Sequence, residues 1–298
     1  MSCQTSVGDA SVTLVCATFQ VSRSSVYAAR RAASETGPMK PVTPRQRCAV
    51  AAPELVAAVR SILDDHPAWG DRKVWATLRR SREGSITYRV GRRRVYEIMR
   101  AKGWTLPGQA RETQQTRGHV AVPEPNRRIA ADLTTIWTRR SGMVAVVLTV
   151  DCGCRSVLDV TATKSQRSSA ILRPIERGLI EAFGDRSSVG DGAELRTDHG
   201  PQFTGADAEA LAARWGLQHT FAPVGRPTGN AVAERTIQTM KVECLWLQDF
   251  EDVEAVQRAV DPWREVFNHH RPHQSLDWKT PAEFRAEKLG TPPTRAAA

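Results

Sequence analysis

The sequence contains no long apolar run and no recognisable export signal. Its longest mainly apolar stretch, Met143–Val150, is far shorter than the ~20 residues that a membrane-spanning helix requires. The residues that follow Met1 show neither the basic nor the apolar region of a signal peptide. We therefore expect a protein of the cytoplasm that has no membrane partner.

Cysteine is scarce as well. The 6 cysteines are scattered along the chain, at positions 3, 16, 48, 152, 154 and 244, which predicts a reducing compartment. Cys152 and Cys154 form the only close pair, and no further Cys or His stands near them at the spacing of a zinc site. The pair therefore predicts a hairpin turn rather than a metal centre. A long leucine heptad is also missing.

Positive charge is present, and it is concentrated in one part of the chain. Hydrophobic residues make up 41% of the 298, enough for a real core, and the net charge is +10. Residues 1–120 hold 20 Lys and Arg against 9 Asp and Glu, whereas residues 121–298 hold 22 against 23. This division predicts a DNA-binding unit that precedes a separate catalytic unit. A basic face that only keeps the protein soluble is the alternative.

Two helical regions are expected in the basic part. Residues 1–34 predict a helix, a tight turn and a second helix, for which an ordinary helical hairpin remains as likely a description as a DNA-binding one. Residues 35–52 contain glycine and three prolines and predict a linker. Residues 53–106 predict three helices with apolar residues at helical spacing. Contact with DNA phosphate is expected from the basic residues of this region, Arg72, Lys73, Arg92, Arg93 and Arg94.

The remainder of the chain alternates strands and helices and carries three acids in distinctive places. Asp132 lies in the middle of a predicted strand, and Asp198 directly follows another, where ligands of open α/β sheets bind. Glu234 falls in the first turns of a helix for which Asn230 is a plausible N-cap. Asp151 also ends a strand and is the main competitor, but we interpret it as a residue of a hairpin turn.

Three carboxylates that converge on one place would repel one another without a cation. Carboxylate oxygens are the ligands that Mg²⁺ prefers, and a pair of such ions activates the attacking oxygen and stabilises the leaving oxygen in phosphoryl transfer. We therefore predict that Asp132, Asp198 and Glu234 are both the catalytic residues and the metal ligands. Lys241 lies on the face of the helix that carries Glu234, since seven residues make about two turns.

Four segments resemble the second-frame (OrfB) transposases of bacterial insertion sequences, which have a retroviral-integrase-like DDE core. Asp198 and Glu234 are separated by 35 residues, as in the DDE triad of that family, and Lys241 matches its basic residue. The segments are Ala130–Thr134, Thr197–Phe203, Asn230–Arg235 and Phe267–Leu276. The chain departs from the family at His199, where many members have Asn, and in Asp151–Arg155, where a turn that ends in Ser-Arg is usual.

The resemblance implies an α/β fold: an RNase H-like mixed sheet with flanking helices, the integrase core, preceded by an all-α helix-turn-helix region. It places the helix-turn-helix domain in residues 53–106, a connector in 107–125, the catalytic core in 126–285 and a disordered tail in 286–298. The implied function is Mg²⁺-dependent cleavage and strand transfer at the ends of an insertion sequence, with Mn²⁺ as a substitute metal. The alternative is a catalytically inactive DNA-binding protein or repressor derived from a transposase.

The same resemblance implies the partners. They are DNA, as terminal inverted repeats and as target, further copies of this chain on that DNA, and an upstream-frame (OrfA) partner or fusion. Arg235, next to Glu234, and Lys241 are expected to contact DNA in the core. A bacterial cytoplasm, in association with the nucleoid, is the implied location.

Overall fold

The computed structural model describes residues 52–80, 90–106, 122–222 and 230–290, all within one compact unit, Val50–Ala298. The helical pair predicted for residues 1–34 lies outside the described residues. So do the linker 35–52 except for its last residue, the connector up to residue 121, and the tail from residue 291. None of the described helices is long and apolar enough to cross a membrane.

The first described elements are three helices that share a small core. They are α3 (Ala52–Asp65), α4 (Asp71–Arg80) and α5 (Arg92–Ala101). Val59, Val74 and Val95 are fully buried, one from each helix, because apolar residues recur at helical spacing on their inner faces. Trp69, in the turn between α3 and α4, belongs to the same core.

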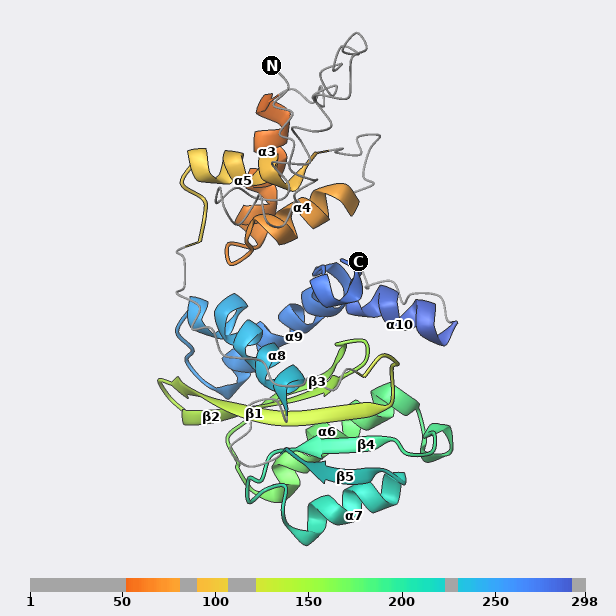
Figure 1. The fold of residues 1–298 in the computed structure, drawn as a ribbon. Coiled ribbons are helices and arrows are strands. Elements are labelled where there is room, and N and C mark those ends of the chain that lie inside the picture. The colour runs from red at the N-terminus through yellow and green to blue at the C-terminus, as the bar shows by residue number, and fades with distance from the viewer. Residues whose placement is uncertain (1–51, 81–89, 107–121, 223–229, 291–298) are drawn as a thin grey trace, which may run out of the picture. The chain divides into compact units, whose positions relative to one another are not determined.

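The rest of the chain is built on a five-stranded mixed sheet with the strand order β3-β2-β1-β4-β5 (Figure 1). The strands are β1 (Arg128–Thr138), β2 (Gly142–Asp151), β3 (Val157–Thr163), β4 (Glu194–Thr197) and β5 (Gln218–Phe221). The first three pair antiparallel, while β4 lies parallel to both β1 and β5. The central strand is therefore β1, which has an antiparallel neighbour on one side and a parallel neighbour on the other.

Helices cover both faces of this sheet. On one face, α6 (Ser168–Phe183) and α7 (Ala206–Trp215) bury a cluster that includes Ile129 and Ala131 of β1. On the other, α8 (Ala231–Glu243) and α9 (Val253–Glu265) cover a second cluster, which includes Ala130. Because side chains alternate along a strand, Asp132 projects on the same face as Ala130, toward α8.

The chain continues beyond α9 into a short C-terminal region. A π-helical turn, Val266–His270, and a 3₁₀ turn, Gln274–Leu276, lead to α10 (Pro281–Leu289). Thr280 and Glu283 form a capping box at the start of α10, each accepting a hydrogen bond from the other's backbone N–H. This helix ends at Leu289. The catalytic core was predicted to end at residue 285, so part of the predicted disordered tail is helical.

Candidate active site

The pairing of β1 with β4 brings two of the three acids side by side. Ala130 is the register partner of Arg196, and the two strands run parallel. Two residues further along each chain stand Asp132 and Asp198, so these residues occupy adjacent positions on neighbouring strands, which lie roughly 4.8 Å apart. Asp198 is the first residue after β4, where the chain leaves the sheet.

The carboxylate of Asp198 is held by the turn that follows it. Its Oδ1 accepts a hydrogen bond from the backbone N–H of Gly200 at 2.9 Å. A Cβ on Gly200 would approach this oxygen to 2.9 Å, so a larger residue there would push against the Asp198 carboxylate. His199, the departure from the family pattern, packs its ring 4.9 Å from that of Phe221. The support of Asp198 therefore comes from a backbone donor and does not depend on the side chain at position 199.

Glu234 lies in the first turn of α8. The amide of Asn230 donates a hydrogen bond to the backbone carbonyl of Ala131 at 3.3 Å, which ties the start of α8 to the residue before Asp132. Asn230 is the N-cap residue of α8, as predicted, but its side chain makes no capping hydrogen bond. Its Oδ1 is buried without a hydrogen-bond partner among the described residues. Sequence patterns gave no signal of this contact between a helix and a strand.

The pKa of the Asp132 carboxyl responds to both of the other acids. Burial, with smaller contributions from the charges of Asp198 and Glu234, raises this pKa to about 6. A hydrogen bond from the N–H of Leu133 to Oδ1, 2.7 Å long, and the charge of Lys241 act in the opposite direction. Burial also raises the pKa of Glu234. Negative charge is therefore concentrated around a partly buried carboxyl, an arrangement that costs folding free energy unless a cation is bound.

The donor set suits Mg²⁺, because all three groups supply carboxylate oxygens. Within the described part of the chain, no three His, Cys, Asp or Glu side chains are already gathered as ligands of a single ion. The charges of Asp198 and Glu234 thus reach Asp132, while a bound ion would still have to draw the three carboxylates together.

Two basic side chains accompany Glu234 on α8. Arg235 is exposed. The ammonium of Lys241 lies 5.9 Å from the centre of the Trp246 ring, which is 61% exposed. Both cations are on the helix that borders the acids, and the lysine is close enough to Asp132 to lower its pKa.

Asp151, the competing acid, is occupied elsewhere. It is fully buried, and its carboxylate forms a 3.0 Å ion pair with Arg285. It also accepts hydrogen bonds from the backbone N–H groups of Asn126 and Gly153, each 2.7 Å long. Asp151 is paired with Ile129 in the register of β1 and β2, three residues from Asp132 along β1. Its surroundings are those of a structural carboxylate that fastens the turn after β2.

The basic residues of the helical region differ in how exposed they are. The side chains of Arg92, Arg93 and Arg94, at the start of α5, are 53%, 92% and 57% exposed. By contrast, Lys73 on α4 is only 23% exposed, and its ammonium lies 2.6 Å from the carboxylate of Glu243. Arg72 donates a hydrogen bond to Gln274 at 3.2 Å. The arginines of α5 are thus exposed and form only surface ion pairs, with Asp71 and Glu97, whereas Lys73 of α4 is held by a buried carboxylate.

Comparison with known families agrees with this architecture. Residues 122–227 and 195–281 match two families that are both described as an integrase core domain. Residues 52–111 match an HTH-like domain. The mixed sheet with helices on both faces is the RNase H-like α/β fold of the integrase core, preceded by an all-α helix-turn-helix region.

Similar proteins are known from bacteria and from retroviruses. The transposase InsD for insertion element IS2A/D/F/H/I/K of Escherichia coli is 24% identical over 238 residues, which cover 79% of this chain and 79% of that protein. InsD for IS2 on the F plasmid of Escherichia coli (strain K12) matches to the same extent. The two integrase core matches together span residues 122–281, and over 79% of its length the chain is similar to insertion-sequence transposases.

Two solved structures show a weaker likeness. An intasome of simian T-cell lymphotropic virus, in complex with PP2A regulatory subunit B56 gamma, covers 80% of this chain and 78% of the matched chain, with 15% identity and a TM-score of 0.47. The HTLV-2 integrase catalytic core domain in complex with magnesium covers 54% of this chain and 97% of its own, with 16% identity and a TM-score of 0.39.

Proposed function

We propose that this transposase performs metal-dependent cleavage of insertion-sequence ends and joins them to target DNA, with Asp132, Asp198 and Glu234 as its catalytic residues. One observation carries the proposal: the register of β1 and β4 places Asp132 and Asp198 at adjacent positions, and the charges of Asp198 and Glu234 both raise the pKa of the Asp132 carboxyl. Like charges gathered around a partly buried carboxyl destabilise the fold, so their presence indicates a functional use.

The three carboxylates would hold two Mg²⁺ ions, with Mn²⁺ as a substitute. When bound, the metal supplies Lewis-acid activation of the attacking oxygen and stabilises charge on the leaving oxygen. The chain's own contribution is to orient these acids. Gly200 fixes Asp198, the N–H of Leu133 fixes one oxygen of Asp132, and Asn230 fixes the helix of Glu234.

The reaction proposed is a pair of exchanges at phosphorus. In cleavage, water forms a new P–O bond while the bond to the 3′ oxygen breaks, which releases a 3′-hydroxyl and a 5′-phosphate. In joining, that 3′-hydroxyl attacks a phosphodiester of the target, and the displaced 3′ oxygen leaves and takes up a proton. Lys241, beside the acids, would contact the phosphate and offset its charge.

DNA binding is assigned to exposed cations on two parts of the chain. Arg92, Arg93 and Arg94 would contact the phosphates of an element end, while Arg235 and Lys241 would contact DNA near the acids. DNA contact by Arg72 and Lys73 stays a prediction from the sequence and is not part of this set, because their charged groups already have partners within the chain. The assembly would contain further copies of this chain and an upstream-frame partner or fusion.

The test is a Mg²⁺-dependent cleavage and joining assay on element-end DNA, run beside a gel-shift assay. Asp198→Asn keeps the size of the side chain and removes the charge that holds the metal. Joining should then fall by several factors of ten, each worth ~1.4 kcal/mol at the transition state, while DNA binding persists. Lys241→Ala should instead weaken DNA engagement and leave metal binding intact.

A non-catalytic DNA-binding protein or repressor is the alternative function, and the same assay separates the two. A repressor would bind the element end and give no product with the parent chain under any divalent metal. Activity of Asp198→Asn equal to that of the parent would overturn the assignment of the acids. Loss of binding in step with activity would indicate a folding defect, which thermal unfolding of the variant would reveal.

A further inference from the structure

The outward face of α4 is engaged by residues that lie far away in the sequence. Arg72 donates a hydrogen bond to Gln274, and the Arg80 guanidinium donates to the backbone carbonyl of Trp278 at 2.7 Å. Arg80 also forms an ion pair with Glu283 of α10. These contacts join residues about 200 positions apart, so α4 packs through one face on the helical core and through the other on the C-terminal region.

The most buried of these contacts is a cluster of charges at the end of α8. The guanidinium of Arg271 contacts both oxygens of the Glu243 carboxylate, at 3.1 and 3.0 Å from Nε, and Lys73 contacts Oε1 at 2.6 Å. The side chains of Glu243 and Arg271 are only 8% and 11% exposed. Burial alone would raise the pKa of Glu243, but Arg271 and Lys73 hold it below its usual value.

Two cations therefore share one carboxylate. Burial lowers the pKa of Lys73, and the charge of Arg271 lowers it further. Burial and the same arginine hold the pKa of His273 well below its usual value, so this neighbouring ring adds no third positive charge. Removing one partner from a buried pair leaves an uncompensated charge, so each member of the cluster depends on the others.

The loop that contacts α4, which contains Asp277 and Trp278, has an unusual backbone conformation. Asp277 and Trp278 are consecutive non-glycine residues with φ of 53° and 63°, a conformation that side chains disfavour. This conformation exposes the Trp278 carbonyl to Arg80 and places the Trp278 ring edge-on to Trp75 of α4, with 5.7 Å between the ring centres. Such strain persists only where the surrounding contacts enforce it, which is typical of functional contacts.

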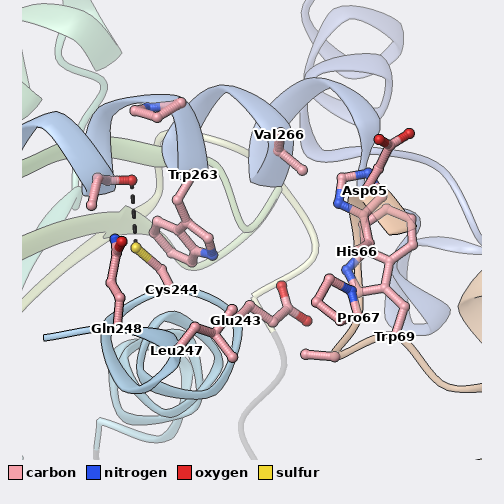
Figure 2. A pocket seen from close by; sticks show the side chains of 13 residues that line it. Asp65, His66, Pro67, Trp69, Glu243, Cys244, Leu247, Gln248, Trp263 and Val266 are labelled. Carbon is pink, nitrogen blue, oxygen red and sulfur yellow. Dashed lines mark hydrogen bonds between the residues drawn. The ribbon is translucent and has the colours of Figure 1, made fainter. Parts of the chain in front are cut away.

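The contact is not closely packed throughout. A cavity of about 390 Å³ lies beside the charge cluster, and Figure 2 shows Glu243 between the side chains of His66 and Trp69 and that of Trp263. The indole N–H of Trp263 is buried without a hydrogen-bond partner among the described residues. A contact made of charged groups around a cavity resembles the separable contacts between domains rather than a core.

We propose that Glu243 together with Arg271–Trp278, hereafter the docking surface, holds α4 against the end of α8 and so sets the position of the DNA-binding helices relative to the catalytic acids. Glu234 and Glu243 stand at opposite ends of the same helix, so a shift of one end moves the other. Lys73 and Glu243 are positioning residues in this proposal and touch no substrate. The docking of α4 is inferred from these contacts alone. Its effect on DNA joining rests on the proposed function.

The first test measures amide hydrogen exchange in the full chain without DNA. Lys73→Met removes one cation from the cluster, and Trp278→Ala removes the ring contact independently. Each should speed exchange in the second half of α8 and in Arg271–Trp278 by about fivefold or more, because local opening of the contact becomes easier. Lys73→Arg, which keeps the charge, should restore most of the protection.

Arg60→Met is the matched control. Arg60 forms an exposed ion pair with Asp64 within α3, so its loss should leave exchange in α8 unchanged. Faster exchange confined to α3, α4 and α5 in both Lys73→Met and Trp278→Ala would overturn docking. If Lys73→Met proves poorly folded, Trp278→Ala decides the outcome by the same criterion.

The second test separates docking from DNA contact. A lysine that binds a phosphate contributes about one unit to the slope of log affinity against log salt. Lys73→Met should leave this slope unchanged and reduce precise joining by about tenfold or more. A slope smaller by about one would show that Lys73 binds DNA instead. A parent chain without joining activity would refute the proposed function, while the exchange experiment would still decide docking.

Discussion

The side-chain amide of Asn230 and the backbone carbonyl of Ala131 lie 3.3 Å apart and form a hydrogen bond. Ala131 immediately precedes Asp132 on the central strand, and the N–H of Glu234 donates to the carbonyl of Asn230 at 3.0 Å. Asn230 therefore connects the two proposed catalytic acids that are farthest apart in the sequence. It does so without using a carboxylate oxygen of either acid.

Replacing Asn230 by Ala should weaken catalysis more than stability. One lost hydrogen bond costs about 1 kcal/mol of folding free energy, but a displaced acid can cost as much as a hundredfold in rate. We expect joining to fall tenfold or more, as measured on element-end DNA. Thr239→Ala is the control, because its hydroxyl bonds only to Arg235 of the same helix. Equal activities of the two variants would contradict this role for Asn230.

Replacing Gly200 by Ala should disturb Asp198 directly. The new Cβ would lie 2.9 Å from Asp198 Oδ1 and 2.5 Å from the Gln202 amide, both tighter than ordinary contact. We expect a loss of joining of about tenfold or more, with a thermal midpoint close to that of the parent. Gly205→Ala is the matched control, since the nearest atom to its Cβ is 3.9 Å away. Full activity of Gly200→Ala would show that the turn has room to adjust.

Asp132→Asn should stabilise the metal-free protein at neutral pH. The pKa of Asp132 rises from 3.8 to about 6 on folding, so the stabilising effect of its proton is complete below about pH 4 and is lost as the pH rises through about 6. At pH 7 the ionised group costs at most about 3 kcal/mol. Denaturant unfolding without divalent metal should show the variant as more stable at pH 7, with the difference vanishing near pH 4.

Divalent metal should reverse this difference. An ion that binds only the folded parent stabilises it by mass action, and protons compete with the ion below about pH 6. The parent should therefore gain stability from Mg²⁺ at pH 7 and little at pH 5, while Asp132→Asn gains little at either. Parallel pH profiles for the two proteins without metal would refute the raised pKa.

Asp151→Asn should lose stability and keep activity, the reverse of what is expected for Asp132→Asn. It leaves Arg285 without its buried partner, which costs about 3 kcal/mol or more of folding free energy. Joining per folded molecule should persist at low temperature, where the variant remains folded. Asp132→Asn, measured alongside, should be inactive although well folded. An inactive but stable Asp151→Asn would make Asp151 the first catalytic acid.

Local patterns were sufficient to predict the elements of the fold. The helix Ala206–Trp215 and the strand Gln218–Phe221 belong to the alternation of strands and helices that the sequence predicts, and Gly216 ends the helix. The adjacency of Asp132 and Asp198 was not a local property, since it depends on strands 66 residues apart pairing in one register. For these acids the family motif supplied what periodicity could not.

Partners of buried polar groups were the part that the sequence could not predict. Asn230 has the residue type and the position of an N-cap. Its side-chain amide nevertheless bonds to the carbonyl of Ala131 in β1 instead of capping the helix. The sequence around Lys73 predicts a residue that contacts phosphate. In the structure its ammonium is instead bonded to Glu243, 170 positions away. A charged side chain has the same local pattern whether it meets solvent, DNA or a distant carboxylate.

The pairing of Asp151 with Arg285 also has a consequence for the order in which the protein forms. The two residues are 134 positions apart. At a ribosomal rate of about 5–20 residues per second, Arg285 is added roughly 7 to 27 seconds after Asp151. Until then the growing polypeptide has an acid at the end of β2 that can be neither buried nor neutralised. A polypeptide released before Arg285 would hold all three catalytic acids and still lack a stable sheet on which to assemble them.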